Sequence, residues 1–289
     1  MFVVAGVTGN TGSVVAATLL EKKQPVRVIV RSQEKGAPWK AKGADVAVAS
    51  LDDAKALAKA FAGASGAYLL VPPNYPAPSY LEDRQKIADA LATAVKDSGL
   101  SHVVFLSSIG AHLPDGTGPI RVVRYGEQKI GAVAKNLTVL RPPYFMENWV
   151  PVIGAAKTNG VLPTFIAPAQ KIPMIATHDI GHIAAEQLIA GGHGRKVLEL
   201  SGPADYSPND VAATLGQLLG RTVETHQAPL EAVVPTFKSF GFSEDAARLF
   251  EEMYSGLVNG QIAFEKTGAT HMHGRVTLSE ALRQFIQAG

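Results

Sequence analysis

Short apolar runs alternate with longer amphipathic stretches throughout the first half of the chain. Between the runs lie stretches such as 79–98, in which Ile87, Leu91 and Val95 fall on one helical face. Strands that alternate with helices imply right-handed crossovers and a parallel sheet that is buried on both faces. The runs that fit such a sheet are short and apolar: 2–6, 26–30, 45–49, 67–71, 102–106 and 137–140. The pattern therefore predicts an α/β fold of the Rossmann type, built on a doubly wound parallel sheet.

Three glycines mark the turn that follows the first run. Gly6, Gly9 and Gly12 stand between the strand at 2–5 and the helical stretch 13–22. A pyrophosphate group needs backbone N–H groups that it can approach closely and a helix N-terminus that points at it. Glycine supplies both the tight turn and the room. Glycine triplets are common in a chain with 28 glycines, but this one lies between a strand and a helix. It predicts a dinucleotide site.

The second strand ends in a cation. In a site for NAD, an Asp or Glu about twenty residues after the glycine motif binds the ribose 2′-hydroxyl. Here Arg31 stands at the end of the strand and Lys35 follows it. A guanidinium can bind a 2′-phosphate through two parallel hydrogen bonds. The pattern therefore favours NADP(H) over NAD(H), and the alternative is a solvated arginine at the end of a strand.

Two further features are candidates for catalysis. Ser107 ends the fifth strand, at the edge of the sheet where doubly wound folds bind their ligands. Tyr125 and Lys129 are four residues apart and so share one face of a helix. A lysine there can hold the nicotinamide ribose and lower the pKa of a neighbouring phenol, which could then act as an acid or base. The spacing is common by chance, so a partly buried aromatic is the alternative for Tyr125.

The second half of the chain loses the regular alternation. After the sixth run, prolines and glycines crowd the apolar stretch 142–173, and the rest mixes helical patterns with short strands at 197–200 and 222–226. We expect residues 1–150 to form the NAD(P)-binding domain and residues 151–289 to form a smaller, mostly helical lobe that covers the substrate. Some later segments are expected to return to the first domain, so that the two parts are interleaved.

Several segments together resemble the NmrA-like branch of the atypical short-chain dehydrogenases. This branch includes NADPH-dependent quinone oxidoreductases, triphenylmethane and azo-dye reductases, and regulators that bind a nucleotide without catalysis. The Arg-Pro-Pro-Tyr-Phe-Met-Glu-Asn run at 141–148 is the most specific of the matching segments. The resemblance covers most of the chain and is carried by 5–12, Arg31, Ser107-Ser108, 141–148, 178–185 and 274–286.

The resemblance implies a set of site residues. The glycine turn would bind the pyrophosphate, Arg31 and Lys35 the 2′-phosphate, and Lys129 would match the helix lysine of the family. The implied cofactor contacts are Gly6, Thr8, Gly9, Asn10, Thr11, Gly12, Arg31, Lys35, Ser50, Val71, Pro72, Pro73, Ser107, Lys129, Tyr144, Phe145 and Glu147. The expected walls of the substrate pocket are Asn74, Tyr144, Asn148 and Trp149. Ala49-Ser50 stands where relatives often have Gly-Asp, so a serine hydroxyl replaces the family's carboxylate at the expected adenine contact.

The composition excludes several classes of protein. The absence of cysteine rules out disulfides, thiolate catalysis and zinc ribbons, and a net charge of +2 does not favour nucleic acid. The N-terminus lacks the features of a signal peptide, and no apolar run approaches the roughly 18–20 residues of a membrane span, so a soluble cytoplasmic protein is expected. His178 and His182 have a metal-like spacing, but no carboxylate is placed to complete a site. We expect no metal, and we expect the histidines of 271–273 to lie in a polar loop.

Two interpretations of the function follow, with a third behind them. The first is an enzyme that transfers a hydride from NADPH to a small electron acceptor that is flat and conjugated, such as a quinone or dye. Such acceptors need little proton catalysis, which fits the weak acid–base pattern. The second is a non-catalytic NADP(H) sensor that reports to a protein partner. The third is a sugar-nucleotide epimerase, against which Arg31 argues. A homodimer is possible, but the sequence does not specify it.

Overall fold

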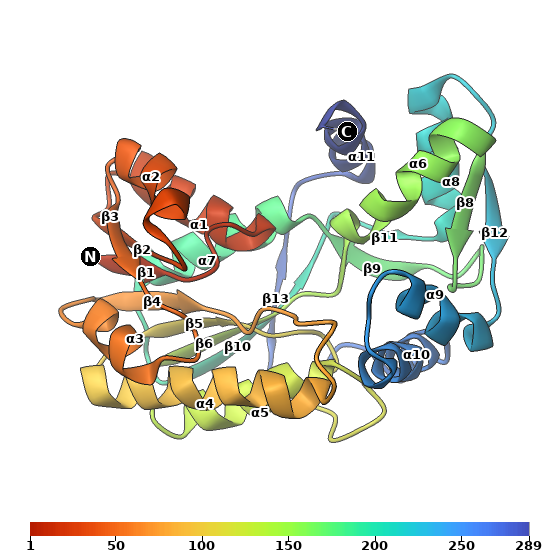
Figure 1. Cartoon of the computed structure of the whole chain (residues 1–289). Helices are drawn as coiled ribbons and strands as arrows, with labels where there is room; N and C mark the ends of the chain where they lie inside the picture. Colours follow the sequence, from red (N-terminus) through yellow and green to blue (C-terminus); the bar gives the residue numbers. More distant parts are fainter. Residues whose placement is uncertain (289) are drawn as a thin grey trace.

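A large parallel sheet forms the centre of the molecule. The computed structural model describes residues 1–288, and within them one sheet has eight strands in the order β13-β10-β6-β5-β4-β1-β2-β3 (Figure 1). The strands are β1 (Phe2–Val4), β2 (Val26–Val30), β3 (Asp45–Val48), β4 (Gly66–Leu69), β5 (Val103–Leu106), β6 (Leu137–Arg141), β10 (Arg195–Ser201) and β13 (Thr270–His273). The first six strands of the chain, β1 to β6, lie in the order β6-β5-β4-β1-β2-β3, which is that of a doubly wound dinucleotide-binding sheet. The predicted fold class is confirmed.

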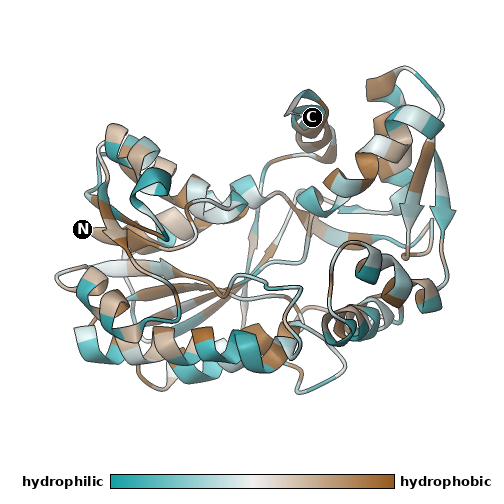
Figure 2. Ribbon diagram, viewed as in Figure 1, coloured by the Kyte–Doolittle hydropathy of each residue, from teal (hydrophilic) through white to brown (hydrophobic). Residues whose placement is uncertain are grey.

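Helices cover both faces of this sheet, as Figure 1 shows. One face carries α1 (Asn10–Glu21), α2 (Gln33–Ala41) and α7 (Thr177–Ala190), and the other carries α3 (Ala54–Phe61), α4 (Tyr80–Ser98) and α5 (Ile120–Gly131). Side chains alternate between the two cores, because Phe2 and Val4 pack beneath α1 whereas Val3 and Ala5 pack on the other face. In Figure 2 the strands of this sheet are mostly brown, while α4 carries both teal and brown residues, as an amphipathic helix does.

Two strands from the second half of the chain extend this sheet. Glu199 of β10 lies beside Arg141 of β6 on one side and beside His271 of β13 on the other. The interpretation of 271–273 as a polar loop is therefore wrong. The strand is hidden in the sequence because it forms the edge of the sheet, where only Met272 packs against the core and its neighbours are exposed.

The rest of the second half forms a smaller lobe with its own core. That core is apolar and includes Met146, Trp149, Leu162 and Leu282. The elements outside the large sheet and its helices are β7 (Tyr144–Phe145), η1 (Met146–Trp149), α6 (Val150–Asn159), β8 (Val161–Thr164), β9 (Ile172–Ile175), β11 (Asp205–Tyr206), α8 (Pro208–Leu219), β12 (Glu224–Gln227), η2 (Leu230–Ala232), α9 (Val233–Ser239), α10 (Glu244–Val258) and α11 (Leu278–Ala288). Among the helices of residues 1–288, none combines the length and apolar character that a membrane crossing requires.

The loop after β4 ties the smaller lobe to the sheet. The backbone N–H of Ser243 donates to the carbonyl of Tyr75 at 2.9 Å, and the backbone N–H of Tyr80 donates to the carboxylate of Asp245 at 2.8 Å. Ser243 also caps α10 by accepting a hydrogen bond from the N–H of Ala246. The start of α10 is thereby fixed against the carboxyl edge of the sheet.

Candidate functional site

The three glycines of the β1–α1 turn differ in how much room surrounds their Cα atoms. Gly6 has φ +70°, and a Cβ there would lie 2.5 Å from the Leu70 Cδ2 atom. A Cβ on Gly12 would lie 2.4 Å from the carbonyl oxygen of Gly6, so this glycine lets α1 pack against the turn. A Cβ on Gly9 would meet only that same oxygen, at an ordinary 3.4 Å. Gly6 and Gly12 are therefore required by the fold, whereas Gly9 leaves open space in front of the helix.

That open space faces the N-terminus of α1. Gly9 is the N-cap residue, and within the described chain no side chain caps the helix and no acidic residue stands in its first turn. The first backbone N–H groups and the positive end of the helix dipole are thus available to an anion. Thr11 is buried behind them, where its hydroxyl accepts a 2.9 Å hydrogen bond from the phenol of Tyr68.

A pocket of about 360 Å³ adjoins this turn at the carboxyl edge of the sheet. It joins the glycine turn to the ends of β2 and β3 and to the loop that follows β4. Its lining residues are Gly6, Thr8, Ile29, Val30, Arg31, Lys35, Ala49, Ser50, Leu51, Asp52, Pro72, Pro73, Asn74, Arg84 and Ile87. The structure therefore brings much of the predicted cofactor set into one place, from segments up to about seventy residues apart in the sequence. Val71 lies half-buried beside this lining.

The cations on the rim of the pocket differ in their partners. Arg31 and Lys35 are exposed, and neither forms an ion pair or a side-chain hydrogen bond within residues 1–288. Arg84 instead pairs with Asp83 and donates to the carbonyl of Pro72 at 2.9 Å, which fixes the loop after β4. Sequence reasoning missed Arg84. Its position near the start of the helix after β4 was the available clue, because such positions face the carboxyl edge.

The Tyr125–Lys129 pair lies away from this pocket. The phenol of Tyr125 donates to the carboxylate of Asp89 on α4 at 2.9 Å. The ammonium of Lys129 lies 3.4 Å from the same carboxylate and 5.0 Å from the centre of the Tyr125 ring. Both polar groups therefore already have partners between α4 and α5, and Lys129 is half-exposed there. A catalytic role for the pair stays a prediction.

Ser107 is part of a buried network under the same sheet edge. Its hydroxyl donates to the Oε1 atom of Glu127 on α5 at 2.5 Å. The guanidinium of Arg141 donates to both oxygens of Glu127, at 2.9 and 2.7 Å, and to Glu265 at 2.6 Å. The side chains of Arg141 and Glu127 are only 5% and 3% exposed. The hydroxyl of Ser107 points into this network and does not line the pocket.

The segment that follows Arg141 mainly builds the junction with the smaller lobe. Glu147 caps α7, because its carboxylate accepts a 2.6 Å hydrogen bond from the hydroxyl of Thr177 and two more from its backbone N–H. Burial raises the pKa of Glu147. Trp149 is buried in the core of the smaller lobe, with Nε1 3.5 Å from the sulfur of Met174, and Asn148 is exposed. Phe145 packs against the core below α1 and α7.

A band of aromatic side chains connects this segment to the loop after β4. We define the aromatic band as Tyr75, Tyr144, Phe165, Phe237, Phe242, Phe250 and Tyr254. Tyr75 stacks on Phe242 with 4.0 Å between ring centres, and Phe165 meets Tyr254 edge-on at 5.3 Å. Burial and the neighbouring phenol of Tyr254 raise the pKa of Tyr144 well above its ordinary value. Sequence reasoning found only Tyr144, because the other members are scattered over distant segments.

Comparison with known proteins gives consistent matches over nearly the whole chain. The model of the NmrA-like family matches residues 1–273. The NAD(P)H azoreductase of Xenophilus azovorans is 28% identical over 260 residues, which cover 88% of this chain and 86% of that protein. Quinone oxidoreductase 2 of Escherichia coli is 25% identical over 296 residues and 99% of both chains.

The solved structures that match share the fold. A crystal structure of an NADPH-dependent quinone oxidoreductase from Escherichia coli superimposes with a TM-score of 0.80 at 23% identity, over 99% of this chain and 100% of that one. Triphenylmethane reductase from a Citrobacter species gives a TM-score of 0.82 at 20% identity, over 99% of both chains.

Proposed function

This chain belongs to the NmrA-like family, and on that premise we propose that it is an NADPH-dependent oxidoreductase that reduces flat conjugated acceptors such as quinones and dyes. The observation that carries the proposal is the pocket in which Arg31 and Lys35, which have no partner among the described residues, stand beside Gly6 and Thr8 of the glycine turn. The curated relatives with azoreductase and quinone oxidoreductase activity support the same reaction class.

The residues of the pocket fit NADPH. The N–H groups at the start of α1 suit a pyrophosphate, and the space in front of Gly9 lets it approach them. Arg31 and Lys35 suit the 2′-phosphate, because each carries a positive charge that no described residue neutralises. Ser50 and Asp52 line the same pocket and offer polar contacts to the adenosine half of the cofactor. They would serve in place of the aspartate that relatives often have at position 50.

When bound, NADPH supplies the hydride, and the protein has to orient the acceptor and exclude water. The aromatic band is the part of this chain suited to that task. Its rings run from the loop after β4, which also lines the pocket, to Tyr254, whose phenol neighbours that of Tyr144 at the start of the segment expected to flank the nicotinamide. Ring faces bind flat conjugated molecules by stacking. We therefore propose that the acceptor binds against this band.

Reduction of such acceptors needs no strong acid from the protein. Charge spreads over the conjugated system as the hydride arrives, so proton transfer can follow from water. The phenol of Tyr125 and the ammonium of Lys129 are occupied by Asp89, in line with a mechanism that does not use them. We propose that binding and orientation, and not acid–base catalysis, are what this protein contributes.

The test is a turnover assay on the purified protein. NADPH or NADH is mixed with a panel of quinones, azo dyes and triphenylmethane dyes, and the loss of the reduced-nicotinamide absorbance is followed. We expect oxidation that requires an acceptor, with NADPH preferred at least about tenfold over NADH, as one lost charge-assisted phosphate contact predicts. Tight NADPH binding with no turnover on any acceptor would favour the sensor interpretation. Epimerisation of an added sugar nucleotide consumes no NADPH and is followed by chromatography; that conversion, without oxidation of NADPH by any acceptor, would favour the epimerase.

A further inference from the structure

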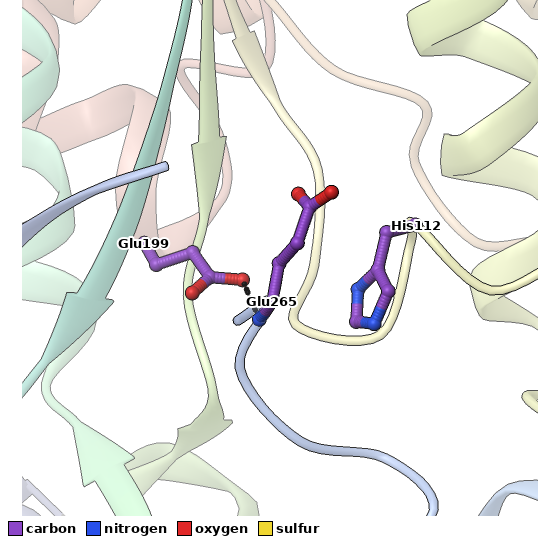
Figure 3. Close-up of side chains that lie close together, drawn as sticks. All are labelled: His112, Glu199 and Glu265. Atoms are coloured by element: carbon purple, nitrogen blue, oxygen red, sulfur yellow. Dashed lines mark hydrogen bonds between the residues drawn. The ribbon is translucent and has the colours of Figure 1, made fainter. Parts of the chain in front are cut away.

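A second group of polar side chains lies outside the pocket, where the large sheet meets the segment before β13. It consists of His112 from the loop between β5 and α5, Glu199 from β10, and Glu265, and we name it the carboxylate–histidine cluster (Figure 3). One potential ligand atom from each residue lies within 4.8 Å of the other two. Three separate segments of the chain therefore each contribute one potential ligand side chain to this small region.

Glu199 is the most informative member of the cluster. It is fully buried, at 0% exposure. Its Oε1 atom accepts a 2.8 Å hydrogen bond from the backbone N–H of Glu265, drawn in Figure 3, but its Oε2 atom has no hydrogen-bond partner within residues 1–288. The Nδ1 atom of His112 is likewise buried without a partner. A buried carboxylate oxygen with no partner is costly, and such an atom in a native protein calls for an unseen ligand or proton.

Neither of the two neighbouring arginines contacts Glu199, and within the described residues the one basic side chain next to its Oε2 atom is that of His271, at 3.5 Å. The buried guanidinium of Arg141 binds Glu127 and the Oε2 atom of Glu265, and the half-exposed Arg195 also reaches Glu127. Three carboxylates lie here, those of Glu127, Glu199 and Glu265. The two arginines pair with Glu127 and Glu265 only, and neither contacts Glu199. The buried carboxylate of Glu199 therefore has no arginine or lysine as a partner in the described part of the chain.

We propose that the carboxylate–histidine cluster binds a divalent transition-metal ion, with Zn²⁺ as the fitting probe. Imidazole nitrogen and carboxylate oxygen are common zinc ligands, and bonds of roughly 2.1 Å place neighbouring ligand atoms about 3.4 Å apart. Rotation of exposed or half-buried side chains can close the present spacing to that value. The Nε2 atom of His271 lies 3.5 Å from Glu199 Oε2, so this ring borders the cluster on the side of β13.

The bound ion would be structural. Its ligands come from the β5–α5 loop, from β10 and from the segment before β13, so the ion would tie the last strand to the rest of the sheet. None of these side chains lines the cofactor pocket. The site is therefore independent of the proposed reductase activity, and NADPH binding should not depend on it.

The experiment is a calorimetric titration of the full-length protein with Zn²⁺. Because the Nε2 atoms of His178 and His182 lie 3.2 Å apart and could themselves hold zinc, the titration uses a protein with both changed to Asn. In this background we expect one saturable Zn²⁺ per chain. Glu199→Gln keeps the shape of the side chain and should weaken the affinity at least about a hundredfold. His112→Gln should weaken it at least about tenfold, while the exposed His193→Gln serves as the matched control and should leave it unchanged.

Melting temperature provides the second readout. Zn²⁺ should raise the melting temperature of the control protein, and EDTA should reverse the rise, because a ligand that binds only the folded state stabilises it. Unchanged NADPH binding shows that each variant is folded. The proposal is overturned if no saturable binding occurs, or if the affinity survives Glu199→Gln. It is equally overturned if Glu199→Gln raises the melting temperature while Zn²⁺ has no effect on the parent, since a proton then occupies this carboxylate.

Discussion

The pocket beside the glycine turn and the buried network around Glu127 differ in whether their charged side chains are paired. In the pocket, Arg31 and Lys35 are exposed cations with no partner in the described chain. In the network, the guanidinium of Arg141 is buried, and each of its nitrogens donates to a carboxylate. Exposed charges cost little when unpaired, whereas buried charges have to be paired. The exposed cations of the pocket are therefore free to bind a ligand at little cost, whereas the paired charges of the network have a role in the fold.

The Tyr125–Lys129 pair resembles the network, because both of its polar groups have partners. Its spacing is that of a catalytic pair, yet Asp89 from the neighbouring helix satisfies both groups. The pair is exposed enough that its interactions contribute little to stability. The difference between the two regions yields four tests, which range from complete loss of function to almost no change.

Gly9→Val should have the largest effect, because a branched side chain would fill the space that the pyrophosphate needs. At least two charge-assisted hydrogen bonds of about 1.5–3 kcal/mol each are lost, so NADPH affinity should fall more than about a hundredfold. The melting temperature should change little, since a Cβ there meets its nearest atom at 3.4 Å. Calorimetry and thermal melting measure the two effects.

Gly12→Val is the contrasting variant for this test. Its Cβ would lie 2.4 Å from a backbone oxygen, so this change should lower the melting temperature sharply. If Gly9→Val melted as low as Gly12→Val, the role assigned to the open turn would be incorrect.

Glu127→Ala tests the buried network. It leaves the guanidinium of Arg141 without its main partner in a buried place, which should cost about 3–5 kcal/mol of unfolding free energy. Chemical denaturation measures this cost. The Kd for NADPH should stay within about threefold, because neither residue lines the pocket. A large loss of NADPH affinity in a protein that remains folded would show that the network and the pocket are one site.

Arg31→Asp should lower NADPH affinity about ten- to a hundredfold, because it removes a charge-assisted contact of about 1.5–3 kcal/mol. NADH affinity should be retained or improved, since an aspartate can accept a hydrogen bond from a free 2′-hydroxyl. Lys96→Asp makes the same change of charge at the exposed end of α4 and is the control. Equal NADPH affinity in the two variants would leave Arg31 as an ordinary surface residue.

Tyr125→Phe and Lys129→Ala should have the smallest effects. We expect kcat and the KM for NADPH to stay within about threefold of the parent, because both groups contact Asp89 and not the pocket. Loss of a true general acid would instead lower kcat by about 10²–10⁴. Steady-state kinetics on a quinone separates the two. A fall in kcat beyond a hundredfold with NADPH binding intact would establish the acid–base pair that its spacing predicts.

Local sequence patterns were enough to predict the sheet and to single out several residues that line the pocket at its carboxyl edge. The turn at Gly6–Gly12 and the cation at Arg31 sit at fixed positions after buried strands, so topology alone brings them to one edge. The edge strand at 270–273 was not predicted, because exposed strands lack an apolar run. The aromatic band and Arg84 escaped because their partners are distant in the sequence.

The roles of individual polar side chains were the least predictable part. Glu147 and Ser107 stand at family-like positions, yet their side chains bind Thr177 and Glu127. Which partner a carboxylate or hydroxyl chooses depends on packing between segments that no local pattern contains. For the same reason, Glu199 and Glu265 attract no notice in the sequence.

Isotope transfer tests the central claim most directly. NADPH that carries deuterium at both hydrogens of its reactive nicotinamide carbon is incubated with the protein and a cationic triphenylmethane dye, and the colourless product is analysed by mass spectrometry. If the hydride passes directly to the acceptor, each product molecule carries one deuterium on its central carbon, and Gly9→Val forms far less product at the same NADPH concentration. A reduced product without deuterium, or binding of NADPH and dye with no reduction, would contradict the account.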